Sequence, residues 1–147
     1  QVGQTVIQLD YGYTNARFLR YDNGLENFKG KRVPFAPENT LHASIDRTVS
    51  CKSNWLDAVT VHAGYRGCGT IWWSESNDVS QPFYGLFDAS LSFSRGRYTL
   101  QCWGKNLTNT DYDTFYFVSM GNAFLQKGRP LQVGAKLSIF LAQHQTN

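Results

Sequence analysis

Residues 84–107 constrain the fold more than any other part of the sequence, because apolar and polar residues alternate strictly along their first half. The apolar residues of this half lie two positions apart and share one side of an extended chain: Phe87, Ala89, Leu91 and Phe93. The intervening Asp88, Ser90 and Ser92 take the other side. Gly96 supplies a turn, and the alternation then resumes from Tyr98, with Trp103 falling on the polar side. The stretch therefore predicts a long antiparallel hairpin.

Four other segments alternate in the same way and predict further strands. They cover residues 4–13, 40–51, 56–66 and 128–141. The six predicted strands are joined by three long connections and by short turns at 52–54 and 94–97. The long connections contain the irregular segments 22–39, 67–82 and 108–128. In an antiparallel meander, successive connections lie at opposite ends of the sheet. All three long loops should therefore share one rim, as in outer-membrane barrels with short periplasmic turns and longer outward loops.

Composition limits the class of protein. A chain of 147 residues is long enough for one domain and too short for two ordinary ones. Its net charge is only +3 and the basic residues are scattered, which argues against a nucleic-acid-binding surface. Aromatic residues make up 15% of the chain, and no apolar run reaches the ~18 residues of a membrane-spanning helix. A barrel remains compatible with the mean hydropathy of -0.39, because barrel strands alternate.

Cys51, Cys68 and Cys102 are an odd number of cysteines at wide spacing. This spacing suggests neither a disulfide framework nor a zinc site with paired ligands, so we interpret them as structural residues. The sequence indicates no cofactor and no metal. It also contains no nucleophile with a base at a plausible spacing and no phosphate-binding glycine loop, and we therefore predict that the chain is not an enzyme.

The candidate ligand-contacting residues are aromatic residues in the predicted long loops. They are Trp72, Trp73, Tyr112, Phe115 and Tyr116. Such rings could stack on a sugar or on an aromatic siderophore. The favoured alternative is structural: an aromatic girdle at the lipid boundary, or packing between loops.

His42 and His62 fall on the polar sides of their predicted strands. In a barrel they would face the lumen. A role in binding metal requires converging partners, which spacing alone does not reveal, so a solvated histidine of the barrel wall is the favoured interpretation.

The sequence resembles the C-terminal barrel segment of TonB-dependent outer-membrane receptors, of a Bacteroides-like type. Four pieces carry the resemblance in register: GYTNARF at 12–18, GKRVPFAPENTL at 30–41, YTLQCWGKNLTNTDY at 98–112 and GNAFLQKGRPLQVGAKLSIF at 121–140. The family usually ends on an aromatic residue, whereas Leu141 stands at that position here and is followed by six more residues.

The resemblance implies a function and a set of partners. These receptors are 22-stranded barrels that hold an N-terminal plug and import siderophores, cobalamin or glycans with energy passed on by TonB. Residues 1–147 would supply the last six strands, without the plug domain or the TonB-contacting segment. The expected partners are the rest of the barrel, the plug and outer-membrane lipid, with TonB engaged only through segments outside these residues. The location implied is the bacterial outer membrane.

The alternative function is a soluble antiparallel barrel that binds a small ligand on its inner face. The residues of that face would be Thr40, His42, Thr60, His62, Ser90 and Ser92. Physical reasoning supports the larger assembly, because an open sheet in lipid leaves unpaired backbone groups along both edges. If these residues fold alone, we expect a small closed barrel, a sandwich or self-association that covers the apolar faces.

Overall fold

The computed structural model describes residues 3–141, and every regular element in this range is a β-strand. The elements are β1 (Gly3–Tyr13), β2 (Asn39–Ser53), β3 (Leu56–Cys68), β4 (Ile71–Trp72), β5 (Ser80–Gln81), β6 (Tyr84–Arg95), β7 (Tyr98–Lys105), β8 (Asp113–Ser119), β9 (Asn122–Lys127) and β10 (Gln132–Ile139). Within this range no helix is long and apolar enough to cross a membrane.

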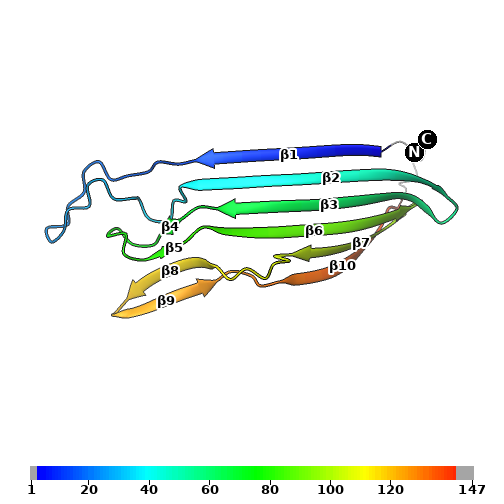
Figure 1. Cartoon of the computed structure of the whole chain (residues 1–147). Helices are drawn as coiled ribbons and strands as arrows, with labels where there is room; N and C mark the ends of the chain where they lie inside the picture. The colour runs from blue at the N-terminus through cyan, green and yellow to red at the C-terminus, as the bar shows by residue number, and fades with distance from the viewer. Residues whose placement is uncertain (1–2, 142–147) are drawn as a thin grey trace, which may run out of the picture.

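Six of the strands form one antiparallel sheet in the order β1-β2-β3-β6-β7-β10. The order follows the chain, so the sheet is a meander, as the alternating segments predict. The three long connections all lie at one end of the sheet, while the β2–β3 and β6–β7 turns lie at the other (Figure 1). In the latter turn Gly96 has φ 52, the positive value expected there.

The pairing register separates the sheet into an apolar and a polar face. On the apolar side, Ile7 pairs with Ile45, which pairs with Ala63, and Ala63 pairs with Ala89. Two residues further along β1, Leu9 begins a parallel row that crosses the sheet in the same way. Because side chains alternate along each strand, these rows form one continuous surface, which we call the apolar face. The residues between them form the polar face.

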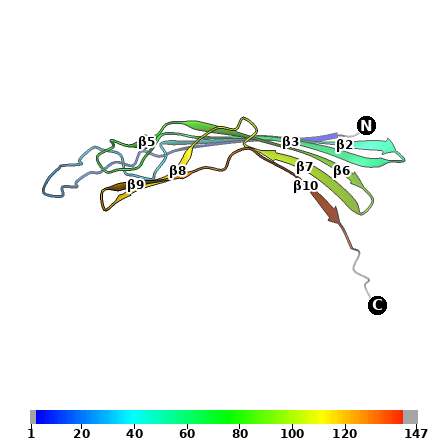
Figure 2. The same ribbon diagram turned by 90° about the horizontal axis from the view of Figure 1, so that it is seen from below.

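Neither face of the sheet is covered, and Ile7 and Leu9 are 74% and 72% exposed. The buried hydrophobic residues of the described chain are Phe28, Trp73 and Leu86, which lie in or beside the long connections. The sheet is a curved single layer (Figure 2). Its core therefore sits in the loops at one rim, and the sheet itself has the form of a wall.

The sheet is also open. β1 and β10 are its two edges, and within residues 3–141 neither edge pairs with another strand of the sheet. The small closed barrel or sandwich expected for these residues alone is therefore not what the structure shows. Within residues 3–141 the pairing runs in the single order β1-β2-β3-β6-β7-β10, which leaves β1 and β10 at opposite edges of the sheet.

Two of the long connections are more regular than the sequence predicts. Residues 67–82 contain the short β4–β5 pair, and residues 108–128 contain the β8–β9 hairpin. The turn of the second hairpin uses Met120 at φ 50 and Gly121 at φ 76. Positive φ at both central turn positions favours Asn-Gly or Asp-Gly, so a Met-Gly turn carries little sequence signal.

The first long connection, residues 14–38, was expected to be an exposed irregular loop. It is irregular, but it folds back on itself through isolated bridges between Arg17 and Arg32 and between Asp22 and Asn27. This folding buries Phe28 to 4% exposure, with its ring stacked on that of Tyr21. The Pro, Gly and charged residues of this segment predict its turns correctly, but this composition gives no sign that the turns bury an apolar residue.

Candidate functional site

The three long connections form one packed layer, which we call the loop layer and define as residues 14–38, 69–83 and 106–131. Asn77 joins the first two connections, because its side chain accepts a bond from Arg32 N at 2.7 Å and donates one to Arg32 O at 3.0 Å. Gln81 joins the second and third by accepting a bond from Asp113 N at 2.8 Å. Both links use a side-chain amide on a backbone group, so they position the loops in the absence of a continuous sheet.

An aromatic array crosses this layer. Phe35 lies between Trp73 and Phe115, with ring centroids 5.6 Å and 5.5 Å apart respectively. The array continues from Phe115 to Phe117 and then to Phe124, whose rings are stacked at 4.9 Å. Rings at these spacings stabilise one another beyond the area that they bury. Packing between loops, one of the two structural alternatives, therefore accounts for Trp73 and Phe115.

The other candidate residues of the loops are distributed around the array. Tyr112 stacks on Tyr84 at 4.4 Å and lies so close to Gly128 that a Cβ there would come within 2.1 Å of its ring. Trp72 is half-buried in β4, and Tyr116 is half-buried in β8. The structure thus brings Trp73 and Phe115 together through Phe35, a residue that the sequence did not single out. Their role in ligand contact stays a prediction.

Both candidate histidines lie on the polar face and are paired with carboxylates. His62 Nδ1 lies 2.7 Å from Asp46 Oδ1, and His42 Nδ1 lies 3.2 Å from Asp10 Oδ2. Each pair joins neighbouring strands, which fits a polar wall cross-linked by side chains. Among the residues that the structure describes, no group of three or more His, Cys, Asp or Glu side chains could hold a metal ion. The three cysteines are free, and Cys102 is exposed.

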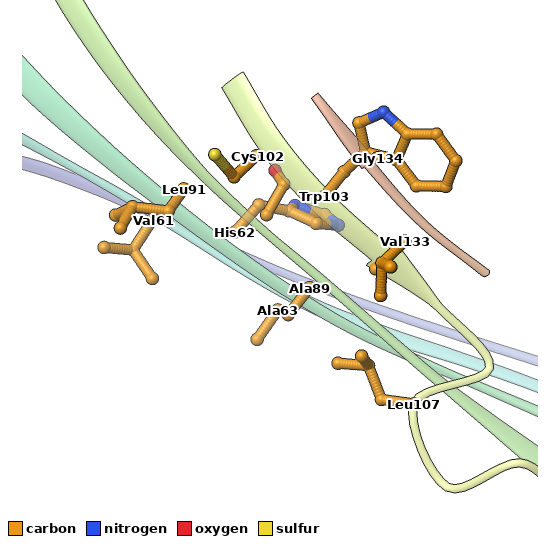
Figure 3. A pocket seen from close by; sticks show the side chains of 12 residues that line it. Val61, His62, Ala63, Ala89, Leu91, Cys102, Trp103, Leu107, Val133 and Gly134 are labelled. Carbon is orange, nitrogen blue, oxygen red and sulfur yellow. The ribbon is translucent and has the colours of Figure 1, made fainter. Parts of the chain in front are cut away.

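Trp103 is the large aromatic residue of the polar face. It pairs with Ser90 on one side and with Gly134 on the other, and its ring extends over β10 at Gly134 (Figure 3). A Cβ at Gly134 would lie 2.5 Å from the indole, so the glycine leaves the space that the ring fills. Lys105 lies over the ring at 5.9 Å from its centroid. The break in alternation seen in the sequence is therefore a tryptophan that lies on the polar face of the sheet.

A shallow hollow of about 680 Å³ lies at the same strands (Figure 3). It forms where Ala63, Ala89 and Gly104 succeed one another across three strands, with the larger Leu91 and Leu107 on either side. The lining also includes His62, Ser90 and Trp103 of the polar face, but the surface that the hollow exposes is almost entirely apolar. The hollow suits contact with hydrocarbon and not recognition of a polar compound.

Known proteins provide an independent comparison. No family model matches the chain. Among solved structures, it is similar to the crystal structure of the ferric yersiniabactin uptake receptor FyuA from Yersinia pestis, with a TM-score of 0.69 and 22% sequence identity. The similarity shows the fold. It is an all-β fold with a six-stranded antiparallel sheet similar to part of this uptake receptor. The match covers 76% of this chain and 17% of the receptor, so the chain spans a small part of the protein that it resembles.

Proposed function

We propose that the chain is part of the barrel wall of a TonB-dependent receptor of the bacterial outer membrane, and that it contributes six strands and three outward loops to nutrient uptake. The arrangement of the connections is the main support, because every long connection lies at the rim opposite the tight turns. In the proposed orientation, the loop layer is on the cell surface, and β1, β3 and β7 run outward.

The two faces of the sheet fit this role. The apolar face would contact lipid, and its hollow would be filled by acyl chains. The polar face, with the pairs Asp10–His42 and Asp46–His62, would face the lumen and the plug. In hydrocarbon an unpaired strand edge costs several kcal/mol per backbone group, so β1 and β10 would each pair with a further strand of the same barrel.

The similarity to an uptake receptor gives separate support, because it arises from the backbone and not from the sequence motifs. Those motifs resemble TonB-dependent receptors, and the similar structure is an uptake receptor rather than an enzyme. A siderophore, cobalamin or a glycan is the proposed cargo class, with transport energised by TonB through segments outside these residues. The Bacteroides-like type stays a prediction.

The alternative of a soluble barrel that binds a ligand on its inner face has less support. Such a module needs a closed interior, whereas His42 and His62 lie on one face of an open sheet. The apolar face also lacks any covering layer within residues 3–141. A soluble module would expose this face to water, which soluble monomers avoid beyond a few hundred Å².

Cysteine labelling in intact cells tests the proposed orientation. In a variant whose native cysteines are replaced by serine, Met120→Cys places a thiol at the tip of the β8–β9 hairpin, where the side chain is 98% exposed. Trp55→Cys places one in the β2–β3 turn, where the side chain is 81% exposed. We expect a membrane-impermeant maleimide to label the Met120→Cys variant in intact cells and the Trp55→Cys variant only after permeabilisation. Labelling of both variants in intact cells, or of the Trp55→Cys variant alone, would overturn the proposal.

A further inference from the structure

A pocket of about 390 Å³ opens between the first and second long connections of the loop layer. Its lining residues come from both connections and are Glu26, Phe28, Pro34, Phe35, Trp73, Ser74, Glu75 and Ser76. The volume is within the range of ~300–1,000 Å³ of small-molecule sites. Of the aromatic residues that the sequence marks as candidates, only Trp73 lines this pocket, so it is a site that sequence reasoning misses.

The apolar part of the pocket consists of aromatic rings that pack against one another or against neighbouring rings. Phe28 and Trp73 are 4% and 7% exposed, and Phe35 is tilted against Trp73. Tyr21 stacks on Phe28 at 5.0 Å between ring centroids. The indole Nε1 of Trp73 is buried and has no hydrogen-bond partner in the described part of the chain. Phe35 is 52% exposed and packs against Trp73, so it offers a ligand a preformed ring surface at little cost in side-chain entropy.

The polar part of the pocket is acidic, and none of its lining residues is basic. Glu26 pairs with Lys31, whose ammonium also lies over the Phe28 ring at 5.3 Å from its centroid, so the charge of Glu26 is already compensated. Glu75 accepts a bond from the Tyr21 hydroxyl at 3.2 Å, and its negative charge raises the pKa of Tyr21, so this partner stays neutral. The Ser74 and Ser76 hydroxyls lower the pKa of the nearby Asp78, which keeps that carboxylate ionised. Among the residues that the structure describes, no basic side chain pairs with Glu75, which lines the pocket beside Phe35 and Trp73.

We propose that this pocket binds a small organic cation, an ammonium or guanidinium group carried on an apolar body. The body would lie against Phe35 and the edge of Trp73, and the cationic group would meet Glu75 at the rim. A cation gains from ring faces and from a carboxylate at once, whereas a neutral alcohol of the same shape gains mainly from the rings. The inference rests on the proposed function for the position of the pocket on the cell surface, where it would be a contact for cargo or for another extracellular compound.

The test compares isosteric probes on the natural polypeptide that carries this chain, purified in detergent. The probes are 2-phenylethylamine, 2-phenylethanol and phenylacetate, with dissociation constants measured by ligand-observed NMR titration. We expect the amine to bind about fivefold more tightly than the alcohol, and the anion to bind most weakly. Equal affinity for the amine and the alcohol, preference for the anion, or no binding of the amine would overturn the proposal.

Charge-neutral variants identify the site. Glu75→Gln should weaken binding of the amine about threefold and leave binding of the alcohol unchanged. Asp111→Asn is the matched control, because it removes a carboxylate of the third connection that is exposed and pairs with Lys127. The control should change neither affinity by more than about twofold, since Asp111 does not line the pocket and is solvent-exposed and paired with Lys127. An equal loss of affinity for the amine in both variants would contradict the assignment of the site to this pocket. Correct surface labelling of the Met120→Cys variant without amine binding would refute only this inference, whereas failed labelling would refute the proposed function.

Discussion

The sheet and the loop layer are stabilised in opposite ways. The sheet has two uncovered faces, and its strands are held together mainly by backbone hydrogen bonds to neighbouring strands. The loop layer has little regular pairing, yet it buries Phe28 and Trp73 and joins its segments through the amides of Asn77 and Gln81. A sheet with no covering layer within residues 3–141 therefore carries a layer of loops that packs on itself. Substitutions in the loop layer should therefore disturb its packing with or without a bilayer. Substitutions on the apolar face of the sheet should matter only if that face contacts lipid, as proposed.

Trp73→Ala should have the largest effect, and the effect should stay within the loop layer. Removing a buried tryptophan costs about 3–5 kcal/mol, and Trp73 is 7% exposed between the first and second connections. We expect residues 14–38 to become sensitive to protease while the strands stay protected, as measured by limited proteolysis with mass spectrometry. Trp72→Ala is the control, because its half-buried side chain has less packing to lose. Equal sensitivity in the two variants would mean that the array does not hold the layer together.

Leu91→Arg should destabilise the wall only in the presence of a bilayer. Leu91 belongs to the apolar face of β6, and an arginine near the bilayer midplane costs about 2–4 kcal/mol. The measurement is urea unfolding of the natural polypeptide in lipid vesicles, monitored by tryptophan fluorescence. Ser90→Arg, one residue away on the polar face, is the control and should cost much less. A reversed order of the two costs would mean that the faces are assigned the wrong way round.

Asn77→Ala should have a smaller effect, again confined to the loops. Asn77 has φ 56 and makes both hydrogen bonds to the backbone of Arg32, so alanine loses the two bonds and retains the strained conformation. Leaving such groups without partners costs about 1–3 kcal/mol. Hydrogen exchange at Arg32 N should increase accordingly. Asn54→Ala, in the β2–β3 turn at the opposite rim, should leave the exchange at Arg32 unchanged.

The contrast between the two regions also explains what the sequence could predict. Strands such as β6 follow from alternation, because each face of a wall meets a single environment along its whole length. Even Trp103 lies on the polar face, where its position in the alternating pattern places it. Pairing between consecutive strands then follows from the short turns and the meander.

The loop layer could not be predicted in the same way, because its contacts join residues far apart in the sequence. Phe35 connects Trp73 to Phe115 across three connections, and no local pattern marks it. The reciprocal bonds of Asn77 with Arg32 span 45 residues. The pocket beside Glu75 exists only because these long-range contacts fold two connections against each other. Sequence patterns therefore predict the wall and identify some loop aromatics, but they do not predict the packing that builds the pocket.

The smallest expected effect concerns pH and the base of the β8–β9 hairpin. Lys127 Nζ lies 3.0 Å from both Asp111 Oδ2 and Asp113 Oδ1, and these hydrogen bonds raise the pKa of Lys127. A raised pKa in the folded hairpin means that the contribution of the pair is complete below the ordinary lysine pKa of about 10.4 and is lost as the pH rises through the folded value. The pair is exposed, so the contribution is small.

A spin label at Met120→Cys, in the variant whose native cysteines are replaced by serine, would report the order of the hairpin tip. We expect its mobility to be constant from pH 7 to about pH 10 and to increase above that range as Lys127 loses its proton. In Lys127→Met the mobility should already be raised at pH 7, and it should change less between about pH 10 and pH 12. Deprotonation of tyrosine occurs in both proteins and therefore cancels in the comparison. Identical pH curves would show that the ion pair does not order the hairpin, and that aromatic stacking within the loop layer, such as that of Phe117 on Phe124, holds it alone.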